Sequence, residues 1–185
     1  MGTDVIVRPS VEADAPALAA IYGHYVREGF GTFEEVPPSS AAMAGRRAAV
    51  IASGLPYLVA EREGGVIGYA YASIFRPRTG YRYTVEDSVY VAPGAVGQGV
   101  GRVLLAAVLA ACETKGLRQV IAVIGDSENT ASIALHHSLG FTPCGVVRNV
   151  GFKHGRWVDT VWMQKALNGG DETLPDTPGL QLGER

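Results

Sequence analysis

The chain has 185 residues, close to the size of one ordinary domain, so a single core with one functional site is the simplest expectation. Eighteen acidic and sixteen basic residues leave a formal net charge of −2. This balance argues against sequence-independent binding to nucleic acid or to an anionic membrane surface. We therefore expect a small-molecule partner.

Targeting and redox signals are weak. The only cysteines, Cys112 and Cys144, form no C-x-x-C motif and have no histidine at close spacing, so neither a disulfide framework nor a metal site is indicated. The opening "MGTDVIVRPS" lacks the apolar stretch of a secretory signal. The longest apolar run, "VLLAAVLAAC", is about half of the ~20 residues that a membrane span requires. These features fit a soluble protein of a reducing cytoplasm.

The first half of the chain predicts a strand, two helices and three strands. The first strand covers residues 4–10, and apolar residues at three- and four-residue spacing predict a helix over 12–29. A loop with two prolines leads to a second helix, roughly 40–53, which its serines can cap. The segments 55–63, 64–75 and 81–93 then predict three strands in an antiparallel meander.

The second half adds two helices and three strands. A helix begins near Gly99, and "LRQVIAVIG" has the pattern of a buried strand. A short helix follows within 128–141 and ends at Gly140, before strands at about 143–152 and 156–165. Residues 168–185 lack periodic apolar positions and predict a disordered tail behind a domain of residues 1–167. The element order predicts an α+β fold with a mixed sheet.

Three alternating glycines, Gly97, Gly99 and Gly101, lie between a strand and a helix in "AVGQGVGRVLLAAVL". Such a turn gathers free backbone N–H groups at the positive end of a helix, which favours an anion such as phosphate. A Walker loop needs Lys where Val100 stands, and a dinucleotide fingerprint needs different glycine spacing. A glycine-rich turn without a ligand remains the alternative.

The stretch "VYVAPGAVGQGVGRVLL" resembles the pyrophosphate loop of the GNAT acyltransferases, whose pattern [QR]-x-x-G-x-[GA] falls on residues 96–101. The resemblance implies a mixed, mostly antiparallel twisted sheet with helices on both faces. It also implies acetyl-CoA as co-substrate, and nothing in the chain suggests a metal. Val96 departs from the pattern, and we expect weaker coenzyme A binding rather than its loss. The implied coenzyme-binding residues of this loop are Gly97, Gln98, Gly99, Val100, Gly101 and Arg102.

The same resemblance assigns roles on either side of the loop. Val89, Tyr90 and Val91 would run along the pantetheine, with the Val89 N–H facing the thioester oxygen. We expect the strand to bulge at Asp87, which breaks the apolar alternation.

The helix within 128–141 also resembles a GNAT element. Asn129 and Ser132 match positions on the coenzyme side of that helix. His136 stands where the family has a tyrosine, so we expect it to protonate the departing thiolate or to form a polar wall of the site. A hydrogen-bonded helix residue is the alternative.

The general base is expected on the strand before the glycines. Alternation in "YTVEDSVYV" places Glu86, Ser88 and Tyr90 on one face of that strand. Apolar and aromatic neighbours should raise the pKa of Glu86 and make it a usable base for the acceptor amine. An exposed carboxylate is the alternative.

A basic, aromatic loop precedes this strand. Arg76 and Arg78 lie close to Tyr81 and Tyr83 in "FRPRTGYRYTVE", and arginine suits bidentate recognition of a carboxylate or phosphinate. The loop therefore predicts an amine acceptor that carries negative charge, such as an amino acid. A solvated basic loop is the alternative.

Four segments, "TVEDSVYV", "VIAVIG", "LHHSLGF" and "GFKHGRWVD", together resemble the phosphinothricin N-acetyltransferases, including members that acetylate methionine sulfoximine and methionine sulfone. The similarity runs from "VRPS" to about Leu167. It implies a homodimer with Glu86 as the catalytic glutamate. The expected acceptor-binding residues are Phe33, Arg76, Arg78, Tyr81, Tyr83, Asp87 and Ser88. The turn "KHGRW" could be a dimer contact or part of the pocket rim.

The resulting hypothesis is a cytoplasmic N-acetyltransferase that moves acetyl from acetyl-CoA to the α-amino group of phosphinothricin or of a methionine sulfoximine- or sulfone-like amino acid. Transfer would be direct, within a ternary complex. Two alternatives stay open: acetylation of a peptide or protein N-terminus, and a non-catalytic acyl-CoA-binding sensor.

Overall fold

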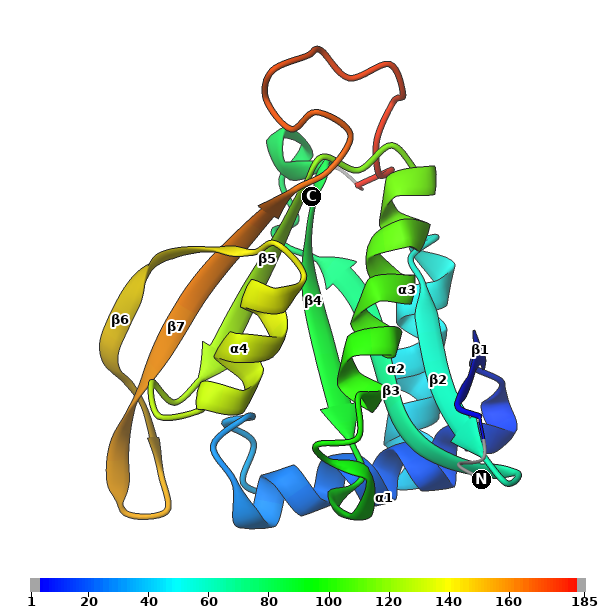
Figure 1. Ribbon diagram of the computed structural model, residues 1–185, viewed down its shortest axis with the longest axis vertical. Helices are drawn as coiled ribbons and strands as arrows, with labels where there is room; N and C mark the ends of the chain where they lie inside the picture. The colour runs from blue at the N-terminus through cyan, green and yellow to red at the C-terminus, as the bar shows by residue number, and fades with distance from the viewer. Residues whose placement is uncertain (1–3, 183–185) are drawn as a thin grey trace.

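The computed structural model describes residues 4–182. Its centre is a seven-stranded sheet in the order β1-β2-β3-β4-β5-β7-β6 (Figure 1). Neighbouring strands are antiparallel except for β4 and β5, which are parallel. The strands are β1 (Ile6–Pro9), β2 (Tyr57–Arg62), β3 (Gly65–Ile74), β4 (Thr84–Val91), β5 (Gln119–Gly125), β6 (Thr142–Lys153) and β7 (Arg156–Ala166). The predicted α+β fold with a mixed, mostly antiparallel sheet is confirmed.

Helices cover both faces of the sheet, as expected (Figure 1). On one face, Leu18 and Tyr22 belong to a buried cluster with Tyr69 of β3. On the other, Leu104 belongs to a larger buried cluster with Ala70 of the same strand. The first face carries α1 (Ala15–Glu28) and α2 (Ser40–Ala52), and the second carries α3 (Val100–Thr114) and α4 (Thr130–Ser138).

Short 3-10 turns and caps fix where the helices begin. Glu12–Asp14 form a 3-10 turn before α1, so the regular helix starts later than the sequence pattern predicts. Ser39 is the N-cap of α2, and its hydroxyl accepts the Ala42 N–H at 3.1 Å. Further 3-10 turns lie at Thr79–Tyr81 and Pro93–Ala95.

The segment after β7 has no helix or strand, but it lies against the domain, across the top of the view in Figure 1. The Asn168 amide donates to the carbonyls of Glu113 and Leu117, and the Tyr83 hydroxyl donates to the Thr177 carbonyl at 2.5 Å. Leu180 packs on the larger apolar core. Backbone and short polar contacts thus place residues 168–182 against the domain, and apolar periodicity does not report such contacts. The disorder expected of the tail stays a prediction.

Candidate active site

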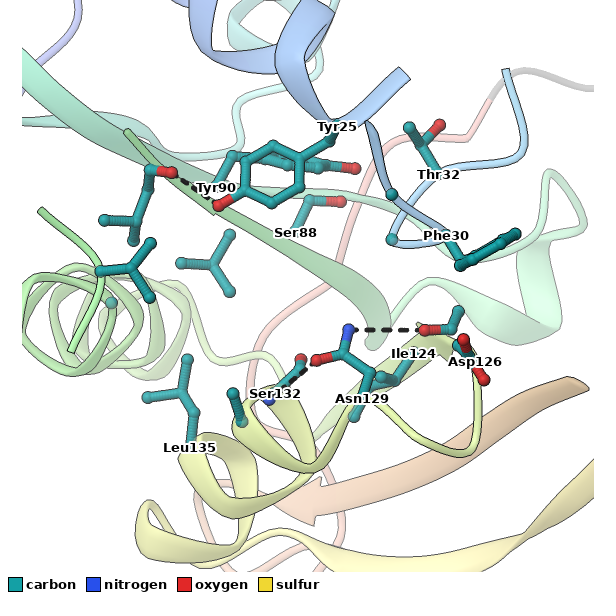
Figure 2. Close-up of a pocket in the computed structure, with 18 of the residues that line it drawn as sticks. Tyr25, Phe30, Thr32, Ser88, Tyr90, Ile124, Asp126, Asn129, Ser132 and Leu135 are labelled. Carbon is teal, nitrogen blue, oxygen red and sulfur yellow. Dashed lines mark hydrogen bonds between the residues drawn. The ribbon is translucent and has the colours of Figure 1, made fainter. Parts of the chain in front are cut away.

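A large cavity opens where β4 and β5 separate. Their pairing runs only from Thr84↔Gln119 to Glu86↔Ile121. Beyond that point lies a cavity of about 1200 Å³, walled by α1, the loop after it, β4, the glycine turn and α4 (Figure 2). This volume is ample for a large cofactor-like molecule together with a small acceptor.

Among residues 4–182, the edge of β4 beyond Glu86 has no neighbouring strand on the side of this cavity. The Ala92 N–H donates to the Ile67 carbonyl of β3, so the alternate residues Val89 and Val91 direct their backbone groups to the open side. The Val91 carbonyl accepts the Tyr25 hydroxyl at 2.6 Å, a contact drawn in Figure 2. Val89, Tyr90 and Val91 all line the cavity, which suits an extended chain with amide groups laid along the strand.

The expected bulge at Asp87 is absent. The register of β3 against β4 runs without interruption from Gly68↔Val91 to Ile74↔Val85. The opening arises because β5 leaves the neighbourhood of β4 after Glu86. Strand alternation could not distinguish these two ways of making a gap.

The glycines of the turn serve two geometric needs. Gly97 and Gly99 have φ of +77° and +80°, a left-handed conformation that side chains disfavour. Gly101 has an ordinary backbone, but a Cβ there would lie 3.2 Å from Leu135 of α4. The first hydrogen bonds of α3 run from the Arg102 and Val103 N–H groups to the Gly99 carbonyl, so the N–H groups of Val100 and Gly101 precede them. Gly97, Gly99, Val100, Gly101 and Arg102 line the cavity. The turn therefore has the geometry of a backbone cradle for an anion.

Gln98 does not fit the prediction that it binds the coenzyme. Its amide donates to the Gly94 carbonyl at 2.8 Å and accepts from Arg62 at 2.7 Å, and it does not line the cavity. The Gln98 side chain therefore stabilises the glycine turn through contacts outside the cavity.

Glu86 lies half-buried at the cavity wall, on the face of β4 that alternation predicts. Burial raises the pKa of its carboxyl, the charge of Asp87 adds to that rise, and the charge of Arg76 opposes it. A carboxylate with a raised pKa is a better proton acceptor than an exposed one. Ser88 lies two residues along and also lines the cavity.

Asp87 and His136 form a buried pair that joins β4 to α4. His136 Nε2 lies 3.0 Å from Asp87 Oδ2, and Nδ1 lies 2.7 Å from the Ser132 carbonyl. Burial opposes protonation of the imidazole, but the hydrogen bond and charge of Asp87 outweigh it and the pKa of His136 is raised. Both residues also line the cavity. The two ring nitrogens of His136 already have partners within the fold, which favours the alternative of a hydrogen-bonded helix residue. The expected roles of His136 as the acid and of Asp87 in acceptor binding stay predictions.

Asn129 and Ser132 lie at the start of α4, on the cavity wall opposite α1 (Figure 2). Asn129 is the N-cap: its Oδ1 accepts the Ser132 N–H at 3.2 Å, and its Nδ2 donates to the Gly125 carbonyl at 3.4 Å. This predicted coenzyme-binding amide is thus used to begin the helix.

The basic loop before β4 does not enter the cavity. Arg76, Arg78 and Tyr81 are exposed, and Tyr83 donates to the C-terminal segment instead. None of the four lines the cavity, in contrast to the prediction. The 3-10 turn at Thr79–Tyr81 redirects the chain at this point, and periodicity gave no sign of it.

One wall of the cavity comes largely from residues that sequence reasoning missed. Phe33 was expected there, and it is joined by Tyr25, Phe30 and Thr32 (Figure 2). Arg156, from the "KHGRW" turn, also lines the cavity. Its guanidinium lies 3.9 Å above the Phe30 ring and pairs with Asp126. In the sequence, the only indication of this contact was an arginine in a short turn between two predicted strands.

Within residues 4–182, no three His, Cys, Asp or Glu side chains group as metal ligands would. No helix in this part of the chain has the length and apolar character needed to cross a bilayer.

A sheet opened between two parallel strands, beside a glycine turn at a helix N-terminus, is the arrangement expected of an acyl-CoA-dependent acyltransferase. The model of the Acetyltransferase (GNAT) family matches residues 18–141. The chain belongs to this family and is an acetyl-CoA-dependent N-acetyltransferase.

Individual relatives share this assignment. A phosphinothricin N-acetyltransferase of Alcaligenes faecalis is 58% identical over 170 residues, covering 92% of this chain and 86% of the relative. An L-methionine sulfoximine/L-methionine sulfone acetyltransferase of Salmonella typhimurium is 38% identical, covering 92% and 98%. A crystal structure of a GNAT superfamily phosphinothricin acetyltransferase from Sinorhizobium meliloti, in complex with AcCoA, has a TM-score of 0.91 at 47% identity and covers 95% of both chains.

Proposed function

We propose that this enzyme acetylates the α-amino group of phosphinothricin or of a methionine sulfoximine- or sulfone-like amino acid, by direct attack in a ternary complex. The observation that carries the proposal is Glu86, a half-buried carboxylate with a raised pKa on the wall of the acetyl-CoA cavity. The names of the two curated relatives supply the acceptor class.

Glu86 accepts the proton of the acceptor ammonium, directly or through one water, so that a neutral amine attacks the thioester. Bound acetyl-CoA supplies the activated acetyl group. The Val89 N–H, on the open edge of β4, donates to the carbonyl oxygen as negative charge develops on it. Because His136 is engaged by Asp87 and Ser132, the departing thiolate takes its proton from water.

The acceptor lies between Glu86 and the aromatic wall of Phe30 and Phe33. The names of the two relatives favour a free amino acid over a protein N-terminus as the acceptor. Arg156 is a cation on the cavity wall, but its guanidinium pairs with Asp126, and Arg76 acts on Glu86 from outside the lining. The negative charge of the proposed acceptor therefore rests on the compounds in the names of the relatives. A homodimer is part of the proposal.

The test is release of coenzyme A thiol from acetyl-CoA with phosphinothricin, methionine sulfoximine, methionine sulfone, polyamines and short peptides. Release with the first three compounds alone supports the proposal. Release with polyamines or peptides retains the chemistry but contradicts the acceptor class. Binding of acetyl-CoA without release for any amine would instead support the sensor.

A further inference from the structure

Lys153, the last residue of β6, is a fully buried ammonium group. Its Nζ donates to three backbone carbonyls, those of Tyr25 at 3.2 Å, Gly29 at 2.7 Å and Thr32 at 2.7 Å. An ammonium has three donors, so all of them are used. Their acceptors are the C-terminal turn of α1 and the loop that follows it, residues 29–33.

Burying the Lys153 ammonium costs free energy because the charge loses its hydration. Burial lowers the pKa of Lys153, and the charges of Glu35 and Glu34 only oppose that effect from a distance. Its hydrogen-bond acceptors are carbonyls rather than a carboxylate. The negative end of the α1 dipole and the three carbonyls compensate for the lost hydration. An uncharged side chain of similar length would avoid this desolvation cost, but it would not donate hydrogen bonds to loop 29–33.

Loop 29–33 is fitted closely to the strands beneath it. A Cβ on Gly125, at the end of β5, would lie 2.1 Å from the Phe30 carbonyl oxygen. A Cβ on Gly151 of β6 would lie 2.4 Å from the Phe33 ring. Both strands therefore carry glycine where the loop approaches: the Phe30 backbone lies against Gly125 and the Phe33 ring lies against Gly151. Phe30 and Phe33 both line the cavity.

The β6–β7 turn holds the same loop from the cavity side. The Arg156 guanidinium lies over the Phe30 ring, and His154 makes an edge contact with that ring at 5.5 Å between centroids. Lys153 lies at the start of this turn and Arg156 at its end. The turn thus contacts both the backbone and the side chains of loop 29–33.

We propose that Lys153 is a positioning residue for the acceptor side of the active site: it fastens loop 29–33 to the β6–β7 hairpin and so fixes where Phe30 and Phe33 stand. The role in acceptor binding rests on the proposed function, whereas the fastening of the loop does not. The "KHGRW" turn therefore contributes to the acceptor pocket within a single chain.

The test replaces Lys153 with Met, which keeps the length of the side chain and removes the three donors. We expect the KM for the acceptor to rise about ten- to hundredfold, because a displaced wall misplaces the amine. The KM for acetyl-CoA should stay within about twofold, since the glycine cradle lies elsewhere. Hydrogen exchange in a peptide covering residues 29–35 should accelerate about tenfold or more, while the α3 N-terminus keeps its protection.

Two further variants keep the test decisive. Gly151→Ala leaves Lys153 intact and pushes on Phe33, so it should also raise the acceptor KM selectively, even if Lys153→Met fails to fold. Lys165→Met, at the far end of the same hairpin, is the matched control and should leave the acceptor KM and the loop exchange unchanged. A uniform rise in both KM values, or unchanged values in Lys153→Met and Gly151→Ala, overturns the proposal. If the wild type acetylates none of the amino acids, the proposed function fails, and the loop exchange alone then supports or overturns the fastening role.

Discussion

Glu86 and Asp87 are adjacent carboxylates whose surroundings differ because they lie on opposite faces of β4. Glu86 reaches the cavity wall, where burial raises its pKa. Asp87 also lines the cavity, but it is almost fully buried and pairs with His136. The Glu86 carboxylate has no such pairing with a histidine among these contacts, whereas the Asp87 carboxylate joins β4 to α4.

Replacing Glu86 with Gln should lower turnover by about 10²-fold or more, because the amide cannot accept the proton of the acceptor ammonium. The dissociation constant of acetyl-CoA, measured by calorimetry, should not change, since Glu86 is not part of the glycine cradle. Turnover equal to the wild type would exclude Glu86 as the base.

The pH dependence of kcat/KM in the wild type is a second test of Glu86 as the base. Because the pKa of Glu86 is raised, kcat/KM should fall as the pH drops through a value above the ordinary glutamate range of about 4.3. The Gln variant should lack this acidic limb. If kcat/KM falls at the same pH in the wild type and in the Gln variant, the titrating group is not Glu86.

Replacing Asp87 with Asn should destabilise the fold in a pH-dependent way. The pKa of His136 is raised on folding, so its contribution is fully present below its unfolded pKa and is lost as the pH rises through the folded value. The loss of a buried pair costs about 3–5 kcal/mol when the remaining group is charged. The Tm deficit of Asp87→Asn should therefore be larger at about pH 6 than at about pH 9, on either side of a raised histidine pKa.

Asp14→Asn is the matched control for that measurement. Asp14 is also buried, and its hydrogen bonds with Arg8 lower the pKa of the carboxyl. A lowered carboxyl pKa gives stability above its unfolded value, so this deficit should not change between about pH 6 and about pH 9. If both variants respond alike to pH, the response does not belong to His136.

At the scale of elements, the turn before α3 depends on backbone conformation more than on side chains. Gly97→Ala should raise the KM for acetyl-CoA about tenfold with little change in kcat, because a left-handed φ costs an alanine roughly 1–2 kcal/mol and the N–H groups turn away to relieve it. Gly94→Ala is the control: it lies in the same segment, no atom would crowd its Cβ, and its φ is not positive. Equal effects in both variants would contradict the backbone explanation.

Elements whose residues pack through regular periodicity could be predicted from sequence, and contacts between distant segments could not. The alternation in β4 placed Glu86 correctly, and the glycine spacing located the cradle before α3. The partner of His136 lies 49 positions away, and nothing local in either segment indicates it. The composition of the loop around Arg76 predicted a wall of the acceptor site. Composition, however, does not give the direction in which a loop turns.

At the scale of the whole molecule, β6 is one of the two edges of the sheet, and the β6–β7 hairpin lies to one side of the helices (Figure 1). An edge strand with apolar side chains is a template for association with another chain. Val147, Val150, Phe152 and Trp157 are 45%, 53%, 55% and 61% exposed on this hairpin. Such a surface is costly to leave in water and suits a self-complementary interface.

We therefore expect the wild type to have twice the chain mass of 19.5 kDa in light scattering coupled to size exclusion. The double variant Val150→Glu and Trp157→Glu should shift it toward the monomer, because four buried glutamates per dimer would lose their hydration. Leu174→Glu changes an equally apolar residue that is 91% exposed on the C-terminal segment, so this control should stay dimeric. A monomeric wild type would contradict the dimer, and a dimeric double variant would place the interface elsewhere. Since Lys153 and Arg156 belong to the same hairpin, a dimer formed there would also restrain the turn that contacts loop 29–33.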